Sequence, residues 1–68
     1  MHKILRLRDV MAMTGLSRST LYLRMSEGGF PQSINLDGRA IGWLESEIQQ
    51  WIQARVSERN RGASLGLR

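Results

Sequence analysis

The segment from residue 17 to residue 24 gathers the side chains with the clearest capacity for chemistry. Its first four residues, Ser17–Thr20, combine three short hydroxyl side chains with one arginine. Hydroxyls and free backbone N–H groups at a helix start bind phosphate, and arginine forms bidentate hydrogen bonds with phosphate and with guanine edges. This composition indicates a surface that binds a polyanion. The candidate binding residues here are Ser17, Arg18, Ser19, Thr20, Tyr22 and Arg24.

Several of these side chains also have a purely structural interpretation. Arg18 could be a solvated surface residue, and Tyr22 could pack half-buried instead of contacting a sugar, a thymine methyl group or a phosphate. Arg24 borders the predicted core, so it either extends toward phosphate with its aliphatic stem covered or pairs with Glu27. The hydroxyls on both sides of Arg18 favour the binding interpretation at that position, because such a helix start suits phosphate.

A helix-turn-helix within residues 13–31 would place these side chains on one exposed helix. Gly15 can take the positive φ that ends a helix, and Ser17 is a good N-cap because its hydroxyl accepts from a free backbone N–H. The pattern therefore predicts a short helix over Arg8–Met13 and a second helix over Arg18–Glu27. In this motif the second helix enters the major groove of DNA.

The segment from Gln32 to Trp43 alternates as a β-hairpin does. Asp37-Gly38 is a strong signal for a two-residue type I′ turn, which needs positive φ at both central positions. A turn closed there pairs Ile34 with Ile41. One face of the hairpin then carries Ile34, Leu36, Ile41 and Trp43. Because an isolated hairpin is not stable, we expect it to lie on the helices as a wing.

Arg39 follows the predicted turn at the tip of this wing, where an arginine has nothing to pack against. An arginine in such a position enters the minor groove or contacts backbone phosphate. The alternative is a charge that protects an edge strand from aggregation. We therefore add Arg39 to the candidate DNA-binding residues.

The last predicted helix, Glu45–Ser57, completes the core. Its apolar stripe comprises Leu44, Ile48, Trp51, Ile52 and Val56. The predicted fold class is mainly α with a small β-hairpin, a winged helix-turn-helix with two short helices, a two-stranded wing and a third, C-terminal helix. We expect residues 1–59 to form this one domain and residues 60–68 to form a disordered basic tail.

Composition narrows the classes of function. The 68 residues carry ten Lys and Arg against six Asp and Glu, a formal net charge of +4, with no cysteine and one histidine. The sequence therefore predicts no enzyme, catalytic residue, metal site or cofactor, because no nucleophile has a base at a recognisable spacing. No apolar run is long enough for a membrane span, so we expect a bacterial cytoplasmic protein without a membrane partner or small-molecule substrate. The positive charge favours nucleic acid.

Three motifs follow one another at a specific spacing: LRLRDVMAMTGLSRSTLYLRM, then EGGFP, then GRAIGWLESEIQQWI. From about Ile4 to Arg55, the chain resembles the AlpA family of short phage and prophage regulators, which is similar to excisionases and to MerR-type winged-helix domains. The resemblance implies DNA binding and regulation of phage or mobile-element genes. In some members it also implies an effect on excision through control of an integrase gene.

The sequence departs from the family pattern inside the predicted recognition helix. Family members often have a tyrosine, a basic residue and then an apolar one, whereas here Leu23 precedes Arg24 after Tyr22. This order moves an apolar residue outward. Leu23 then contacts a base methyl group or a partner protein, or else the helix is slightly rotated.

Three functions remain open at this stage. The leading one is a sequence-specific transcriptional regulator that places residues 17–27 in the major groove of double-stranded DNA and residues 37–39 on the minor groove or backbone. The second is an excisionase-like architectural protein that bends DNA, with several copies forming a homo-oligomer on adjacent sites. The third is a protein-interaction adaptor or antirepressor that uses Leu23 and the last helix.

Overall fold

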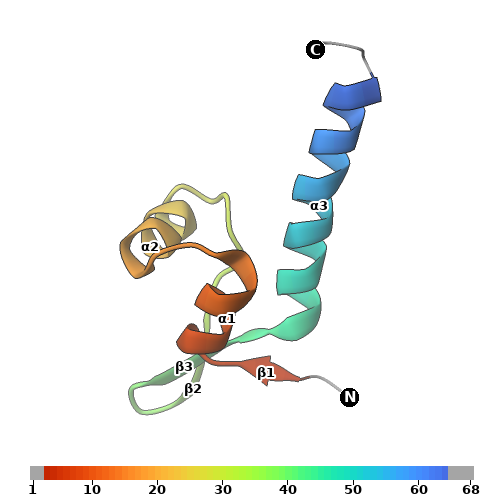
Figure 1. Cartoon of the computed structure of the whole chain (residues 1–68). Coiled ribbons are helices and arrows are strands. Elements are labelled where there is room, and N and C mark those ends of the chain that lie inside the picture. The colour runs from red at the N-terminus through yellow and green to blue at the C-terminus, as the bar shows by residue number, and fades with distance from the viewer. Residues whose placement is uncertain (1–2, 65–68) are drawn as a thin grey trace.

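The computed structural model describes residues 3–64, with side chains through residue 61. Within that part, three helices accompany one small antiparallel sheet of three strands (Figure 1). In chain order the elements are β1 (Ile4–Leu5), α1 (Leu7–Thr14), α2 (Arg18–Ser26), β2 (Ile34–Asp37), β3 (Ala40–Leu44) and α3 (Glu45–Ser64). The predicted fold class, mainly α with a β-hairpin, is confirmed at this level, and the arrangement is consistent with a winged helix-turn-helix.

The turn between α1 and α2 has the local geometry that the sequence predicts. Gly15 is left-handed, with φ +75°, and its N–H donates to the Met11 carbonyl oxygen at 2.8 Å. Ser17 is extended, and its hydroxyl oxygen accepts from the Thr20 N–H at 3.3 Å. These two residues therefore end one helix and begin the next within three positions.

The start of α1 uses a cap that the sequence did not reveal. The helix begins at Leu7, one residue earlier than predicted, and the Arg6 N–H donates to Asp9 Oδ2 at 3.1 Å. A carboxylate in the first turn satisfies a free donor and also interacts favourably with the helix dipole. Asp9 thus replaces the missing N-cap side chain.

The hairpin forms, but its predicted register is wrong by one residue. Ile34 pairs with Gly42, not with Ile41, and the chain reverses at Gly38-Arg39 instead of Asp37-Gly38. Gly38 has φ +54°, and no non-glycine residue in the described part has a positive φ. A positive φ at the first central position alone is the pattern of a type II′ turn, not type I′. The positive φ therefore falls on glycine, which has no Cβ to clash, and Asp37 stays extended in β2.

The observed register separates apolar side chains that were expected on one face. Ile34 and Leu36 are 36% and 40% exposed, whereas Trp43 is fully buried. A one-residue shift turns every side chain of a strand to the opposite face. A bulge between Asn35 and Asp37 takes up the extra residue.

The extended segment at the N-terminus is a strand of the sheet, a pairing that the sequence did not indicate. β1 pairs antiparallel with β3, and the strand order is β1-β3-β2. Gly42 permits this approach, because a Cβ atom there would lie 2.5 Å from Ile4 Cγ2 and 3.0 Å from the Leu5 oxygen. Since β1 leads into α1 through Arg6 alone, the pairing fixes the sheet beside the start of α1.

A small core draws one side chain from each element except β2, together with one from the segment after α2. It comprises Leu5, Val10, Leu21, Phe30, Trp43 and Ile48. Two indole N–H groups hold the segment after α2: Trp43 Nε1 donates to the Pro31 oxygen at 3.1 Å, and Trp51 Nε1 donates to the Gly29 oxygen at 2.7 Å. The Phe30 and Trp51 rings meet edge to face, with centroids 4.9 Å apart. Phe30 and Trp43 are buried in the core, and Trp51 is partly buried against it.

α3 is longer than predicted. It continues to Ser64 instead of Ser57, so residues 60–64, predicted as part of a disordered tail, are helical, and residues 65–68 lie outside the described residues. Ile48 is buried, and Trp51, Ile52 and Val56 are half-buried. Beyond Val56 the helix is polar and projects away from the rest of the molecule (Figure 1).

Candidate nucleic-acid interface

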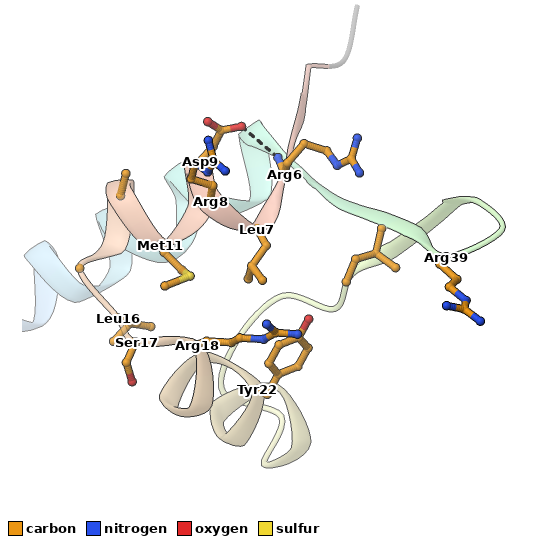
Figure 2. A pocket seen from close by; sticks show the side chains of 13 residues that line it. Arg6, Leu7, Arg8, Asp9, Met11, Leu16, Ser17, Arg18, Tyr22 and Arg39 are labelled. Atoms are coloured by element: carbon orange, nitrogen blue, oxygen red, sulfur yellow. Dashed lines mark hydrogen bonds between the residues drawn. The ribbon is translucent and has the colours of Figure 1, made fainter.

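An open cleft of about 1220 Å³ lies between the start of α1, the start of α2 and the wing (Figure 2). Four arginines contribute to its walls, and the carboxylate among its lining residues is that of Asp9. Leu7, Met11, Leu16 and Ile41 supply apolar surface. Both helices also present their N-terminal ends here, where the macrodipole is positive. The cleft therefore has the charge and the donors that suit a phosphate backbone.

Arg18 and Tyr22 lie side by side on the α2 wall of the cleft (Figure 2). The Arg18 guanidinium carbon is 5.9 Å from the centre of the Tyr22 ring, within the range of a cation–π contact. Both side chains are exposed. Tyr22 is 36% exposed, and its ring supports the guanidinium that borders the cleft.

Arg39 contributes to the same cleft from the wing, far from α2 in sequence (Figure 2). It occupies the second position of the hairpin turn, and Asn35 Nδ2 donates to the Gly38 oxygen at 3.3 Å beneath it. The fold thus brings together three cationic or aromatic residues that the sequence singled out, namely Arg18, Tyr22 and Arg39.

Ser17 lies on the cleft wall, but its hydroxyl is occupied. The Ser17 hydroxyl donates to Thr20 Oγ1 at 2.9 Å while its oxygen accepts the Thr20 N–H. Ser17 therefore serves as a helix cap. Its hydroxyl hydrogen is already used in the bond to Thr20, so it does not donate to a phosphate in this conformation. Thr20 is half-buried, and its hydroxyl oxygen accepts the hydrogen bond from the Ser17 hydroxyl, so the hydrogen of the Thr20 hydroxyl is not used in that bond.

Ser19, Thr20 and Arg24 do not line the cleft. Ser19 and Arg24 are exposed on other sides of α2. Within residues 3–61, Arg24 forms no ion pair with Glu27, so the pairing left open by the sequence is absent. These residues remain candidates only for contacts made by the outer surface of α2.

Sequence reasoning missed two arginines, Arg6 and Arg8, which line the cleft from the start of α1. Their one sequence signal is basic residues alternating with apolar ones before the first helix. That signal cannot place them beside the wing, because their position depends on the pairing of β1 with β3, about 40 residues apart. Arg6 also supplies the backbone N–H that Asp9 accepts (Figure 2).

The described residues contain no group of three metal-ligating side chains. No described helix has both the length and the apolar character needed to cross a bilayer. The arrangement of the cleft is suited to binding an anionic polymer.

Comparison with known proteins gives a family match and two curated relatives. A family model described as "Prophage CP4-57 regulatory protein (AlpA)" matches residues 3–56. An uncharacterized protein of Enterobacteria phage P4 is 42% identical over 60 residues, which cover 88% of this chain and 68% of the relative. A DNA-binding transcriptional activator, AlpA, of Escherichia coli K12 is 34% identical over 59 residues, covering 78% of this chain and 84% of that protein.

Proposed function

The chain belongs to the AlpA family of prophage regulatory proteins, and from this membership and the basic cleft we propose that it is a sequence-specific DNA-binding transcriptional regulator. In the proposed complex α2 lies in the major groove, and the wing contacts the adjacent backbone or minor groove. The single observation that carries the proposal is the convergence of Arg6, Arg8, Arg18 and Arg39 on one cleft between these two elements.

The proposed docking follows from the exposure of α2. Leu21 is fully buried, whereas Ser19, Tyr22 and Leu23 are exposed, so the helix presents a complete outer face to a partner. The major groove of B-DNA is wide enough for one such helix. With α2 in the groove, the neighbouring sugar-phosphate strand enters the cleft, where Arg39 approaches it from the wing, while Arg18, in the first turn of α2, reaches the base edges.

The biological role follows the named relative. That relative is a DNA-binding transcriptional activator, and we propose that this chain likewise controls transcription, in the bacterial cytoplasm where its DNA lies. Within residues 3–61 the cleft holds arginines and apolar groups but no cluster of catalytic or metal-ligating side chains, so binding is the activity that its chemistry supports.

The salt dependence of DNA binding tests the proposal. Contacts with roughly four to six phosphates predict that log K falls against log salt with a slope of about −4 to −5. Arg39→Ala and Arg6→Ala should each reduce the magnitude of this slope by about 1, since each removes one cation from the cleft. Arg6→Ala keeps the backbone donor to Asp9, so α1 keeps its cap.

The measurement is fluorescence anisotropy of a labelled duplex between about 50 and 200 mM salt. Arg59→Ala is the matched control, because it removes one exposed cation from the projecting part of α3. A wild-type slope near zero contradicts DNA binding through the cleft. An equal reduction of the slope in Arg59→Ala and Arg39→Ala would show that DNA binding depends only on the net charge of the protein and not on the cleft.

A further inference from the structure

Leu23 occupies the centre of the outer face of α2. Leu21 is fully buried, and two residues along a helix correspond to about 200° of rotation, so Leu23 points almost directly away from the core. Its exposed fraction is 56%, the largest among the exposed large hydrophobic side chains of the described residues. Nothing in that part of the chain covers it.

The neighbours of Leu23 on the helix surface are short and polar. One turn before it lies Ser19, and one turn after it lies Ser26, whose hydroxyl donates back to the Leu23 carbonyl oxygen at 2.7 Å. Ser26 therefore points its hydrogen at the helix itself. Leu23 stands above both serines as an exposed aliphatic side chain, and the other exposed large hydrophobic residue of α2, Tyr22, lies on the cleft side of the helix.

The isolation of Leu23 argues for a small apolar target. The other exposed aliphatic or Met side chains lie on other elements: Met13 on α1, Ile4 on β1, and Ile34 and Leu36 on β2. A protein-binding hot spot is an extended, well-packed cluster, which α2 does not offer. In the major groove, by contrast, the apolar group on a base edge is the single C5-methyl of thymine.

We propose that Leu23 reads the C5-methyl group of a thymine in the major groove and thereby helps to set the sequence preference of this chain. The inference rests on the proposed function, because it requires α2 to enter the groove. Leu23 then supplies apolar contact at the middle of the helix, while Arg18 and Tyr22 contact the DNA from the cleft side.

The test starts from a DNA site selected by the wild-type chain from a random duplex library. Each thymine of that site is replaced in turn by deoxyuridine, which removes only the methyl group. At one position the wild type should lose about fourfold in affinity, the loss expected for one apolar carbon. Leu23→Ala should show no loss at that position and the wild-type response elsewhere.

The controls separate folding from recognition. Leu23 is exposed and alanine favours helix, so the helical circular dichroism of Leu23→Ala should match that of the wild type. Met13→Ala removes comparable exposed apolar surface from α1 and should keep the fourfold loss.

The outcomes also separate this inference from the proposed function. If the wild type selects a site but Leu23→Ala keeps every deoxyuridine effect, the methyl contact is wrong and sequence-specific binding stands. If the library yields no preferred site, sequence-specific binding fails, and the methyl contact fails with it.

Discussion

Gly42→Ala is the substitution whose effect follows most directly from interatomic distances. An added Cβ would lie 2.5 Å from Ile4 Cγ2, 3.0 Å from the Leu5 carbonyl oxygen and 3.2 Å from Leu36 Cδ1. The side-chain atoms can shift, but the oxygen belongs to the strand paired with β3. Relief of the overlap therefore requires β1 to move away from β3.

The expected cost of this overlap is about 2 kcal/mol of unfolding free energy, within the range for overpacked sites. For a domain of this length that corresponds to a fall in Tm of about 8–16 °C. Thermal unfolding followed by circular dichroism measures it. Gly29→Ala is the matched control, since a Cβ there meets only the Arg24 oxygen, at 3.9 Å, and Tm should stay unchanged or rise slightly.

A double variant identifies the atoms responsible. Ile4→Ala in the Gly42→Ala background removes the closest atom but leaves the Leu5 oxygen, so it should recover only part of the lost stability. A Tm for Gly42→Ala within about 2 °C of the wild type would refute the close approach of β1 and β3.

Two further substitutions address α2 directly. Arg18→Ala should weaken binding to a selected site more than binding to random DNA in a competition assay, because the first turn of the helix reaches base edges; equal losses would mean that Arg18 contacts phosphate only. Ser17→Ala should lower the free energy of unfolding by about 1 kcal/mol in urea titration, as expected for a lost N-cap, whereas Ser19→Ala, at the second position of α2 and exposed, should change it little. Equal stability for the two serine variants would contradict the capping role.

The helix-turn-helix could be predicted because its signals are local. The left-handed Gly15 and the capping Ser17 act within one turn of their own positions, and no distant contact is needed to place them. The same holds for the start of α3 and for the apolar stripe through Ile48. Local chemistry of this kind determines where helices begin and end.

The wing register could not be predicted, because the alternation favours the register that keeps the apolar side chains on one face, and the observed register separates them. The choice depends on Gly42, where the lack of a side chain lets β1 pack against β3. A second factor is the turn itself: in the observed turn the one positive φ falls on Gly38, which has no Cβ to clash. The first effect involves β1, which lies outside the hairpin. The second depends on the backbone conformation of the turn, which the alternation of side chains does not reveal.

The candidate site was predictable only in part, for the same reason. Arg18, Tyr22 and Arg39 could be singled out from their places on a helix face and in a turn. Arg6 and Arg8 join them through the long-range pairing of β1, which no local pattern announces.

The attachment of β1 to β3 has a consequence for the geometry of the proposed complex. β1, which is paired with β3, leads into α1 through Arg6, and the tight Gly15 turn joins α1 to α2, so the wing and α2, the two proposed contact points with DNA, are held on one common support. The distance between α2 and the wing is therefore fixed by the fold. In DNA, each base pair adds about 3.4 Å of rise and about one tenth of a turn between the feature that α2 contacts and the feature that the wing contacts. Such a chain would measure the spacing between two features of a duplex as well as the chemistry of each.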